Sequence, residues 1–188
     1  MPDENFTDLM AERVVLRRFR LDDLDAFLAY RSSPQVARFQ GWDAPFPAGE
    51  AKRLIRQMTT DQPDTPGEWF QFAVMLRSTG ELIGDCAVRP DETDERQAEI
   101  GFTVAPGYQG RGYATEAADA LLGYLFGARG KHRVMAFCDA RNAASARVLA
   151  KLGMRCEGHL RESTWAKGEW TDDLVYAILD REWQVRSS

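Results

Sequence analysis

The sequence predicts a mixed α+β domain (α/β layered), in which helices pack on a single β-sheet. Three observations predict this class. The 188 residues are enough for one domain with a sizeable core. The hydrophobic fraction of 44% and the charged fraction of 28% are typical of a soluble globular protein. Strand-like and helix-like patterns alternate along the chain. We therefore expect one domain over residues 1–188, with its folded core at about residues 13–180.

The first half of the chain predicts one strand, two helices and then three strands. RVVLRRF, which begins at Arg13, is β-branched and predicts a strand. LDDLDAFLAYR has apolar residues at helical spacing, with Asp22 as the expected N-cap and Pro34 as the expected end. FPAGEAKRLIRQMTT carries the second helical pattern. The three strands are predicted at residues 69–76, 82–88 and 98–104, and RSTGEL is the turn between the first two.

The second half predicts two helices and three strands. The clearest helix follows three closely spaced glycines and ends near Gly127 and Gly130. Its apolar face repeats at i, i+3, i+4 and i+7 and comprises Ala114, Ala117, Ala118, Leu121, Leu122, Leu125 and Phe126. HRVMAFC predicts a strand, and NAASARVLAKLG predicts a short helix that ends at Gly153. The last two strands are expected in MRCEGHL and DLVYAIL.

Composition and charge exclude several classes of protein. A formal net charge of −5 argues against nucleic acid as the main partner. We expect no membrane-spanning segment, because no run of about 18 apolar residues is present, and the acidic start MPDENFTDLM is unlike a signal peptide. Cys86, Cys138 and Cys156 are odd in number and widely spaced, which predicts the reduced, buried cysteines of a cytoplasmic protein. His132 and His159 fit no metal-ligand pattern, so we expect no metal site.

A glycine-rich turn leads into the clearest helix, and APGYQGRGYATEA (Ala105–Ala117) predicts an anion site there. The first N–H groups of a helix have no intrahelical partner, and the helix dipole adds positive potential. The glycines allow close approach to a phosphate and a positive φ. A Walker A loop would need Gly-Lys-Ser/Thr where this chain has GYA, and a Rossmann loop would need a third glycine that GRGYAT lacks. The third candidate is an acyl-CoA loop.

QGRGYA (Gln109–Ala114) matches the Q/R-x-x-G-x-G/A signature of the GNAT superfamily of N-acetyltransferases, which this chain therefore resembles. The preceding AEIGFTVAPGYQGRGYATEA and the following DARNAASARVLAKLGMRCEGHLRES are similar to the RimJ/RimL type, the ribosomal-protein-alanine acetyltransferases. The similarity extends from about Leu16 to Leu179, which is nearly the whole chain.

This resemblance implies the GNAT acyl-CoA N-acyltransferase fold, a mixed and mostly antiparallel central sheet that splays in its middle and carries helices on both faces. Acetyl-CoA enters the splay as co-substrate. Its pyrophosphate would be held by the amides around Gln109, Gly110, Arg111, Gly112, Tyr113 and Ala114. Its pantetheine arm would pair with the strand backbone of Phe102, Thr103 and Val104. Asn142 and Ser145 match an N-x-x-S pattern that contacts the pantetheine near the thiol.

The resemblance also implies the catalytic groups. Glu99 is the expected general base, which takes a proton from the acceptor ammonium directly or through water; the alternative is a solvated or ion-paired strand glutamate. Where family members often carry a tyrosine acid, this chain has Leu149. Ser145 is therefore the expected hydrogen-bond donor to the leaving thiolate, unless its hydroxyl only caps its own helix. Tyr176 is either a weaker candidate acid or a core side chain, and no cysteine is placed for a covalent acyl-enzyme.

The expected reaction is acetyl transfer to a primary amine, either a protein N-terminus or a small-molecule amine such as an antibiotic or polyamine, by direct attack in a ternary complex. One alternative is a larger acyl group such as succinyl, and another is a non-catalytic CoA-binding sensor or regulator. The acceptor is expected near Trp42 and Trp165, whereas Asp172 and Asp173 either meet a cationic acceptor or form a solvated turn. Asp85 either lines this groove or satisfies a turn. Apolar surface on the last hairpin suggests a homodimer.

Overall fold

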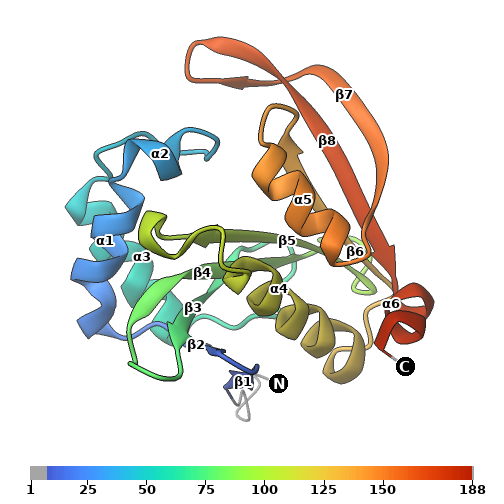
Figure 1. Cartoon of the computed structure of the whole chain (residues 1–188), viewed down its shortest axis with the longest axis horizontal. Helices are drawn as coiled ribbons and strands as arrows, with labels where there is room; N and C mark the ends of the chain where they lie inside the picture. Colours follow the sequence, from blue (N-terminus) through green and yellow to red (C-terminus); the bar gives the residue numbers. More distant parts are fainter. Residues whose placement is uncertain (1–7, 188) are drawn as a thin grey trace.

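The computed structural model describes residues 8–187, which form one β-sheet with helices on both of its faces (Figure 1). The strand order across the sheet is β1-β2-β3-β4-β5-β6-β8-β7. The strands are β1 (Leu9–Met10), β2 (Val14–Arg18), β3 (Phe70–Leu76), β4 (Leu82–Pro90), β5 (Gln97–Val104), β6 (Arg133–Asp139), β7 (Arg155–Ala166) and β8 (Glu169–Leu179). Every neighbouring pair is antiparallel except β5 with β6, which is parallel.

The helices cover the sheet in two layers. They are the 3-10 turn η1 (Leu21–Asp23), α1 (Leu24–Arg31), α2 (Pro34–Ala37), α3 (Ala48–Thr60), the 3-10 turn η2 (Pro106–Tyr108), α4 (Tyr113–Gly123), the π-helical turn η3 (Tyr124–Ala128), α5 (Ala143–Lys151) and α6 (Asp180–Ser187). Helix α4 packs on one face, against β2 and β5, while α1 and α3 lie on the other face (Figure 1). Helix α5 contacts α4, β6 and β7.

The sheet splays in its middle, between β5 and β6. These two strands pair only at Gln97↔Arg133, Ala98↔Val134 and Glu99↔Met135. Beyond this point each strand keeps its other neighbour, because β5 stays paired to β4 as far as Val104 and β6 stays paired to β8 as far as Asp139. The two halves of the sheet therefore diverge after Glu99, and one edge of β5 is left without a strand partner.

One hydrophobic core holds both layers to the sheet. Its fully buried members include Leu16 and Phe72 from the sheet, Ile55 from α3, Leu121 from α4 and Leu149 from α5. These side chains recur at the helical and strand spacings on which the element predictions rest. The predicted helices and strands are all confirmed, as is the mixed sheet layered with helices.

Several local predictions were wrong. Asp22 is not an N-cap, because η1 precedes α1 and the carboxylate of Asp23 instead accepts the Arg20 N–H (2.7 Å) and pairs with buried Arg17. Pro34 begins the short helix α2, in keeping with the fixed φ of proline at a first helical position. By contrast, the end of the α4 segment was predicted correctly, because the chain continues from α4 as η3 and ends its helical course at Ala128, between Gly127 and Gly130.

The end of the chain also differs from the prediction. Strand β7 extends to Ala166 and strand β8 starts at Glu169, so the final hairpin is much longer than the two short strands expected. Helix α6 was missed because its few apolar residues do not repeat at helical spacing. Of the three free cysteines, Cys86 is buried and Cys138 half-buried, but Cys156 is exposed, so the expectation of three buried thiols was wrong.

Candidate active site

Two connected cavities lie where the sheet splays. The larger, about 410 Å³, lies between β5, the start of α4, α5 and the segment around α2. The smaller, about 80 Å³, lies inside the splay. Both are lined by Phe39, Gln40, Phe102, Asn142 and Ser145. Of the residues predicted for the donor site, the larger cavity is lined by Phe102, Thr103, Val104, Gln109, Gly110, Gly112, Tyr113, Ala114, Asn142 and Ser145.

The glycine-rich loop lines one part of the larger cavity. Gly110 and Gly112 have φ of +74° and +85°, a region that L side chains rarely adopt. Gly112 is also the N-cap of α4. The backbone N–H groups of residues 110–115 have no protein acceptor among residues 8–187, since the first N–H bonded at this end is that of Glu116, to the Gly112 carbonyl (3.0 Å). This run of free donors at a helix N-terminus can bind an anion such as a pyrophosphate.

Arg13, the residue before β2, supports this loop and was not recognised in the sequence. Its guanidinium lies 4.7 Å from the Tyr113 ring centroid and donates to the Arg111 carbonyl (3.1 Å). It also pairs with Glu116 (2.7 Å), which accepts the Val14 N–H as well. The negative charge of Glu116 is thereby matched by Arg13. Arg111, the one predicted loop residue outside the cavity lining, contributes its carbonyl to this contact.

The open edge of β5 forms one wall of the larger cavity. The Ala105 N–H donates to Ile83 of β4 (2.8 Å), whereas the Val104 carbonyl accepts the side-chain amide of Gln109 (2.8 Å). Because backbone groups alternate in direction along a strand, Phe102 and Val104 direct theirs toward the open edge and Thr103 directs its own toward β4. The predicted pairing with an extended ligand therefore concerns the backbone of Phe102 and Val104, with Thr103 lining the wall.

Asn142 and Ser145 face each other across the first turn of α5. Asn142 is the N-cap of this helix, and its side-chain oxygen accepts the Ser145 N–H (3.1 Å). The Ser145 hydroxyl has no hydrogen-bond partner among the described residues, so it does not cap its own helix. Both residues line the two cavities where they meet. Leu149 is buried in the wall of the smaller cavity, where it supplies no proton.

Glu99 occupies the last paired position before the splay, on a row of three cross-strand neighbours. Its carboxylate pairs with Arg89 of β4 (2.5 Å), and the Arg89 guanidinium lies 5.0 Å from the Trp69 ring centroid. The side chain of Glu99 is 18% exposed. It is not among the residues that line either cavity. Glu99 is thus ion-paired, which is the state expected as the alternative to a general base, and it lies beside the point where β5 and β6 separate.

The pKa values of the Cys138 thiol and of the Tyr176 hydroxyl are both raised. Burial, and then Asp139, raise the pKa of the Cys138 thiol to about 11, although Cys138 lines the smaller cavity. A thiol of this kind is a poor nucleophile near neutral pH. Tyr176 is buried, and burial raises the pKa of its hydroxyl. It lines neither cavity, which agrees with a core side chain.

Three cations at the mouth of the larger cavity were also missed. Arg38 follows α2, and Arg147 and Lys151 are four residues apart on α5. The i, i+4 spacing of Arg147 and Lys151 places both on one helix face and is the sequence signal that could have revealed them. Their positive charge suits a ligand with several phosphates.

A buried polar cluster lies between α1 and β4. Asp85 accepts hydrogen bonds from the Tyr30 hydroxyl and from Arg31 (3.3 Å), and all three are buried. Asp85 therefore joins α1 to the sheet and does not satisfy a turn. The Arg31 guanidinium lies 4.0 Å from the Trp42 ring centroid, so Trp42 is packed in place. By contrast, Trp165 and Trp170 are exposed at the tip of the last hairpin, 5.4 Å apart between centroids.

The histidines and acidic residues form no metal site among residues 8–187. His159 bonds to Asp172 (2.7 Å), and Asp173 accepts the hydroxyls of Ser163 and Thr164. Asp172 and Asp173 are therefore engaged within the last hairpin. No helix in the described part of the chain is long and apolar enough to cross a membrane.

Comparison with known proteins assigns a family to this arrangement. Residues 13–155 match the family model "Acetyltransferase (GNAT) domain". The chain is 34% identical over 175 residues to the "Uncharacterized N-acetyltransferase YnaD" of Bacillus subtilis (strain 168), covering 93% of this chain and 98% of that protein. A shorter stretch of 84 residues is 30% identical to the ribosomal protein uS5-alanine N-acetyltransferase of Escherichia coli (strain K12), covering 45% of this chain and 43% of that enzyme.

A solved structure has the same fold. The GNAT-family acetyltransferase from Bacillus anthracis matches with a TM-score of 0.83 and 31% sequence identity, covering 93% of this chain and 99% of that one. The fold that the sequence resemblance implied is therefore confirmed.

Proposed function

Because this chain belongs to the GNAT family of N-acetyltransferases, we propose that it transfers the acetyl group of acetyl-CoA to a primary amine, by direct attack of the amine on the thioester in a ternary complex. The observation that carries this proposal is the cavity of about 410 Å³ that joins the free amides at the start of α4 to the splay. At the start of α4, the backbone N–H groups are available as hydrogen-bond donors to phosphates. At the splay, the narrow space would hold an acyl group.

The donor would be held by the chain's own backbone. The N–H groups of residues 110–115 would receive the pyrophosphate, and the open edge of β5 at Phe102 and Val104 would pair with the amides of the pantetheine arm. Asn142 and Ser145 lie where the two cavities meet, which is where the thioester would then lie.

The smaller cavity favours a short, neutral acyl group. Its volume is about 80 Å³, against about 410 Å³ for the larger cavity. Its lining combines apolar side chains, such as Ile100, Ala136 and Leu149, with the neutral polar side chains Gln40, Asn142 and Ser145, and contains no Lys, Arg or His. A succinyl group would bury a carboxylate there without a counter-ion, which is unfavourable. This supports acetyl over the larger acyl groups.

The acceptor ammonium would lose one proton before it attacks and a second proton as the amide forms, and the thiolate would leave with the electron pair of the C–S bond. The amine nitrogen would form a bond to the carbonyl carbon, and the resulting oxyanion would accept an N–H from the open edge of β5, near Val104. The C–S bond would then break. A thiol pKa of about 8.5 makes the thiolate a fair leaving group, and the Ser145 hydroxyl would donate a hydrogen bond to it. Holding both substrates in line would supply much of the rate enhancement.

Glu99 is the proposed general base, acting through a water molecule at the start of the splay. Glu99→Gln is expected to lower kcat by about 10²-fold with a modest change in KM, because a positioned base typically contributes that much. Steady-state kinetics measure this, and Glu95→Gln, an exposed glutamate in the β4–β5 loop, is the matched control. A Glu99→Gln enzyme with the full rate would remove Glu99 from the mechanism.

The proposed acceptor is a protein N-terminus, on the similarity to the uS5-alanine N-acetyltransferase; a small-molecule amine is the second candidate. A thiol-release assay with acetyl-CoA would compare an alanine-initiated hexapeptide, the same peptide with a blocked N-terminus, spermidine and an aminoglycoside. We expect release of CoA with the free peptide and none with the blocked one. CoA binding without turnover on any of these amines would favour the non-catalytic sensor.

Two further expectations remain proposals. A cytoplasmic location is supported by three free cysteines, Cys86, Cys138 and Cys156. A homodimer is supported by the exposed indoles of Trp165 and Trp170 on the last hairpin.

A further inference from the structure

We propose that Lys167, at the tip of the β7–β8 hairpin, is a positioning residue for the acceptor. Lys167 holds residues 39–43 at the open end of the splay and so sets the width of the opening through which an amine reaches the thioester. The inference rests on the proposed function, since it concerns the acceptor side of the same site.

The hairpin reaches far beyond the sheet that carries it. Strand β6 supports β8 only as far as the pair Asp139↔Asp173. Past that point the hairpin strands pair only with each other, at Thr164↔Thr171, Trp165↔Trp170 and Ala166↔Glu169. In Figure 1 this extension arches over the space between α2 and α5. Its tip must therefore be held by contacts with other parts of the chain.

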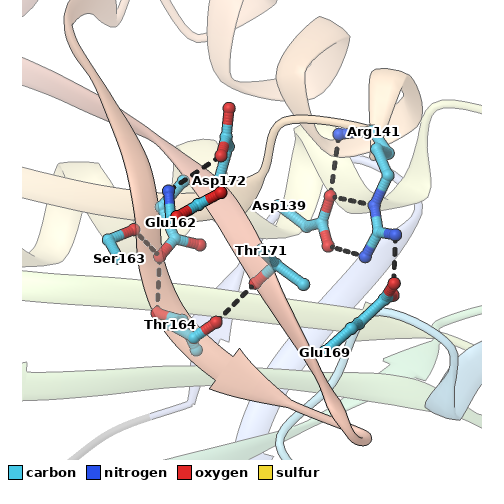
Figure 2. Close-up of polar contacts among 9 residues, drawn as sticks. Asp139, Arg141, Glu162, Ser163, Thr164, Glu169, Thr171 and Asp172 are labelled. Carbon is cyan, nitrogen blue, oxygen red and sulfur yellow. Dashed lines mark hydrogen bonds and ion pairs between the residues drawn. The ribbon is translucent and has the colours of Figure 1, made fainter.

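A bulge in β7 bends the hairpin across the site. The register shifts between Leu160 and Thr164, and Glu162 in the bulge has a φ of +48°. Figure 2 shows the polar contacts that fix it: the Glu162 N–H donates to Asp172 (2.8 Å), and the Thr171 hydroxyl donates to the Thr164 carbonyl (3.2 Å). A bulge bends its strand and increases the local twist. The direction of the hairpin tip is thus set by Asp172 and its neighbours.

Two ion pairs then fix the tip on opposite sides. The Lys167 ammonium donates to the Trp42 carbonyl (2.6 Å) and to the Asp43 carboxylate (2.9 Å). On the other side, Arg141 bridges Asp139 (2.7 Å) and Glu169 (2.8 Å), as Figure 2 shows. The hairpin tip is therefore fastened both to the segment that follows α2 and to the segment that precedes α5.

The residues that hold the hairpin tip, Trp42 and Asp43 on one side and Arg141 on the other, lie next to residues that line the two cavities. Phe39 and Gln40, just before Trp42, line both cavities on one side. Asn142, just after Arg141, lines both on the other side. Trp42 transmits the restraint, because its indole N–H donates to the Arg31 carbonyl (3.1 Å) in the buried cluster. The hairpin tip consequently connects the segment beside Phe39 with the segment beside Asn142. On the Phe39 side, Lys167 supplies both contacts, to the Trp42 carbonyl and to the Asp43 carboxylate.

The first test measures the restraint without any substrate. Exposed ion pairs add little to global stability, so Lys167→Ala is expected to fold. We expect amide hydrogen exchange in residues 39–44 to become about three- to fivefold faster in Lys167→Ala and to stay unchanged in residues 109–117. Lys167→Arg should keep the original exchange, and Lys52→Ala, an exposed lysine of α3, is the control. Unchanged exchange in residues 39–44 of Lys167→Ala would overturn the proposal.

The second test separates acceptor binding from donor binding and chemistry. With the alanine-initiated hexapeptide, Lys167→Ala should raise the peptide KM about three- to tenfold, with kcat within about twofold and the Kd for acetyl-CoA unchanged. A peptide KM equal to that of the original enzyme, or a matching rise in the Kd for acetyl-CoA, would contradict it. If the original enzyme acetylates no amine, the proposed function fails, and the exchange experiment still decides whether Lys167 restrains residues 39–44.

Discussion

At the start of α5, Asn142 and Ser145 have different roles: Asn142 caps the helix, and Ser145 presents its hydroxyl to the cavities. The Asn142 side chain caps the helix by accepting the Ser145 N–H (3.1 Å), so the cap does not need the serine hydroxyl. That hydroxyl is left at the junction of the two cavities without a partner among the described residues. A polar group in such a position is available for a ligand, and a thiolate leaving from the donor would be the first group to need it.

Ser145→Ala should therefore lower kcat about three- to tenfold, because a hydrogen bond to a developing charge is worth about 1 kcal/mol. The melting temperature should stay unchanged, since Asn142 retains the cap. Steady-state kinetics and thermal unfolding measure the two effects. Ser145→Thr, which keeps a hydroxyl, is the matched variant and should retain most of the rate. A Ser145→Ala enzyme with the full rate and lowered stability would assign the serine to the helix alone.

Sequence reasoning at the residue scale succeeded where local pattern decides position. The positive φ values of Gly110 and Gly112 and the helix end at Gly153 follow from short-range rules. It failed where distant segments meet. Arg13 lies 98 residues from Arg111 along the chain, and nothing near either residue predicts their contact.

At the scale of elements, the pairing of β4 with β5 sets the position of the cavity wall. Gly84 allows this pairing, because a Cβ built at that position would lie 2.1 Å from the Thr103 carbonyl oxygen. Gly101, on the neighbouring strand, has no heavy atom within 4 Å of such a Cβ. One glycine is required by the close approach of two strands, whereas the other leaves an open surface beside the splay.

Gly84→Ala is expected to destabilise the protein by about 2–3 kcal/mol, because the two strands must separate to admit the methyl group. Gly101→Ala should leave the stability within about 0.5 kcal/mol. Urea unfolding of both variants measures this difference. Equal stability of the two variants would mean that β4 and β5 do not approach each other as closely as the structure has them.

The elements themselves were largely predictable, but their extent was not. Apolar periodicity located α3, α4 and the strands β2 to β6, since each buries one face in the core. Strands β7 and β8 exceed the prediction because their outer halves are exposed and show no alternation of apolar and polar residues. Lys167 and Gly168, with φ of +51° and +82°, form a two-residue hairpin turn. The predicted strands stop short of this turn, because no alternating pattern leads up to it.

At the scale of the whole molecule, the sheet divides after Glu99 into two halves. One half, β1 to β5, carries α4 and the glycine-rich loop, and the other half, β6 to β8, carries α5 and the long hairpin. Three parallel pairs hold the halves together at one end, and the hairpin tip joins them at the other. The larger cavity is lined by residues of both halves, so neither half forms it alone.

The family resemblance gave this division in advance, although hydrophobic pattern alone did not. Nothing in the apolar spacing of residues 97–104 shows that only Gln97 to Glu99 pair with β6. The residues that the resemblance implied for the donor line the larger cavity, apart from Arg111, and their role in binding stays a prediction. The cations Arg38, Arg147 and Lys151 and the fastening by Lys167 depend on how the halves meet, and only the structure revealed them.

We propose that the cavity between the two halves binds acetyl-CoA through the amides at the start of α4. Isothermal titration of acetyl-CoA into the original chain, Gly112→Val and Gly107→Ala tests it most directly. We predict one site per chain and at least a tenfold weaker Kd in Gly112→Val, because a φ of +85° is strained for valine. Gly107→Ala, where a Cβ meets open space, should bind as the original chain does. No binding to the original chain, or equal binding to all three, would contradict the account.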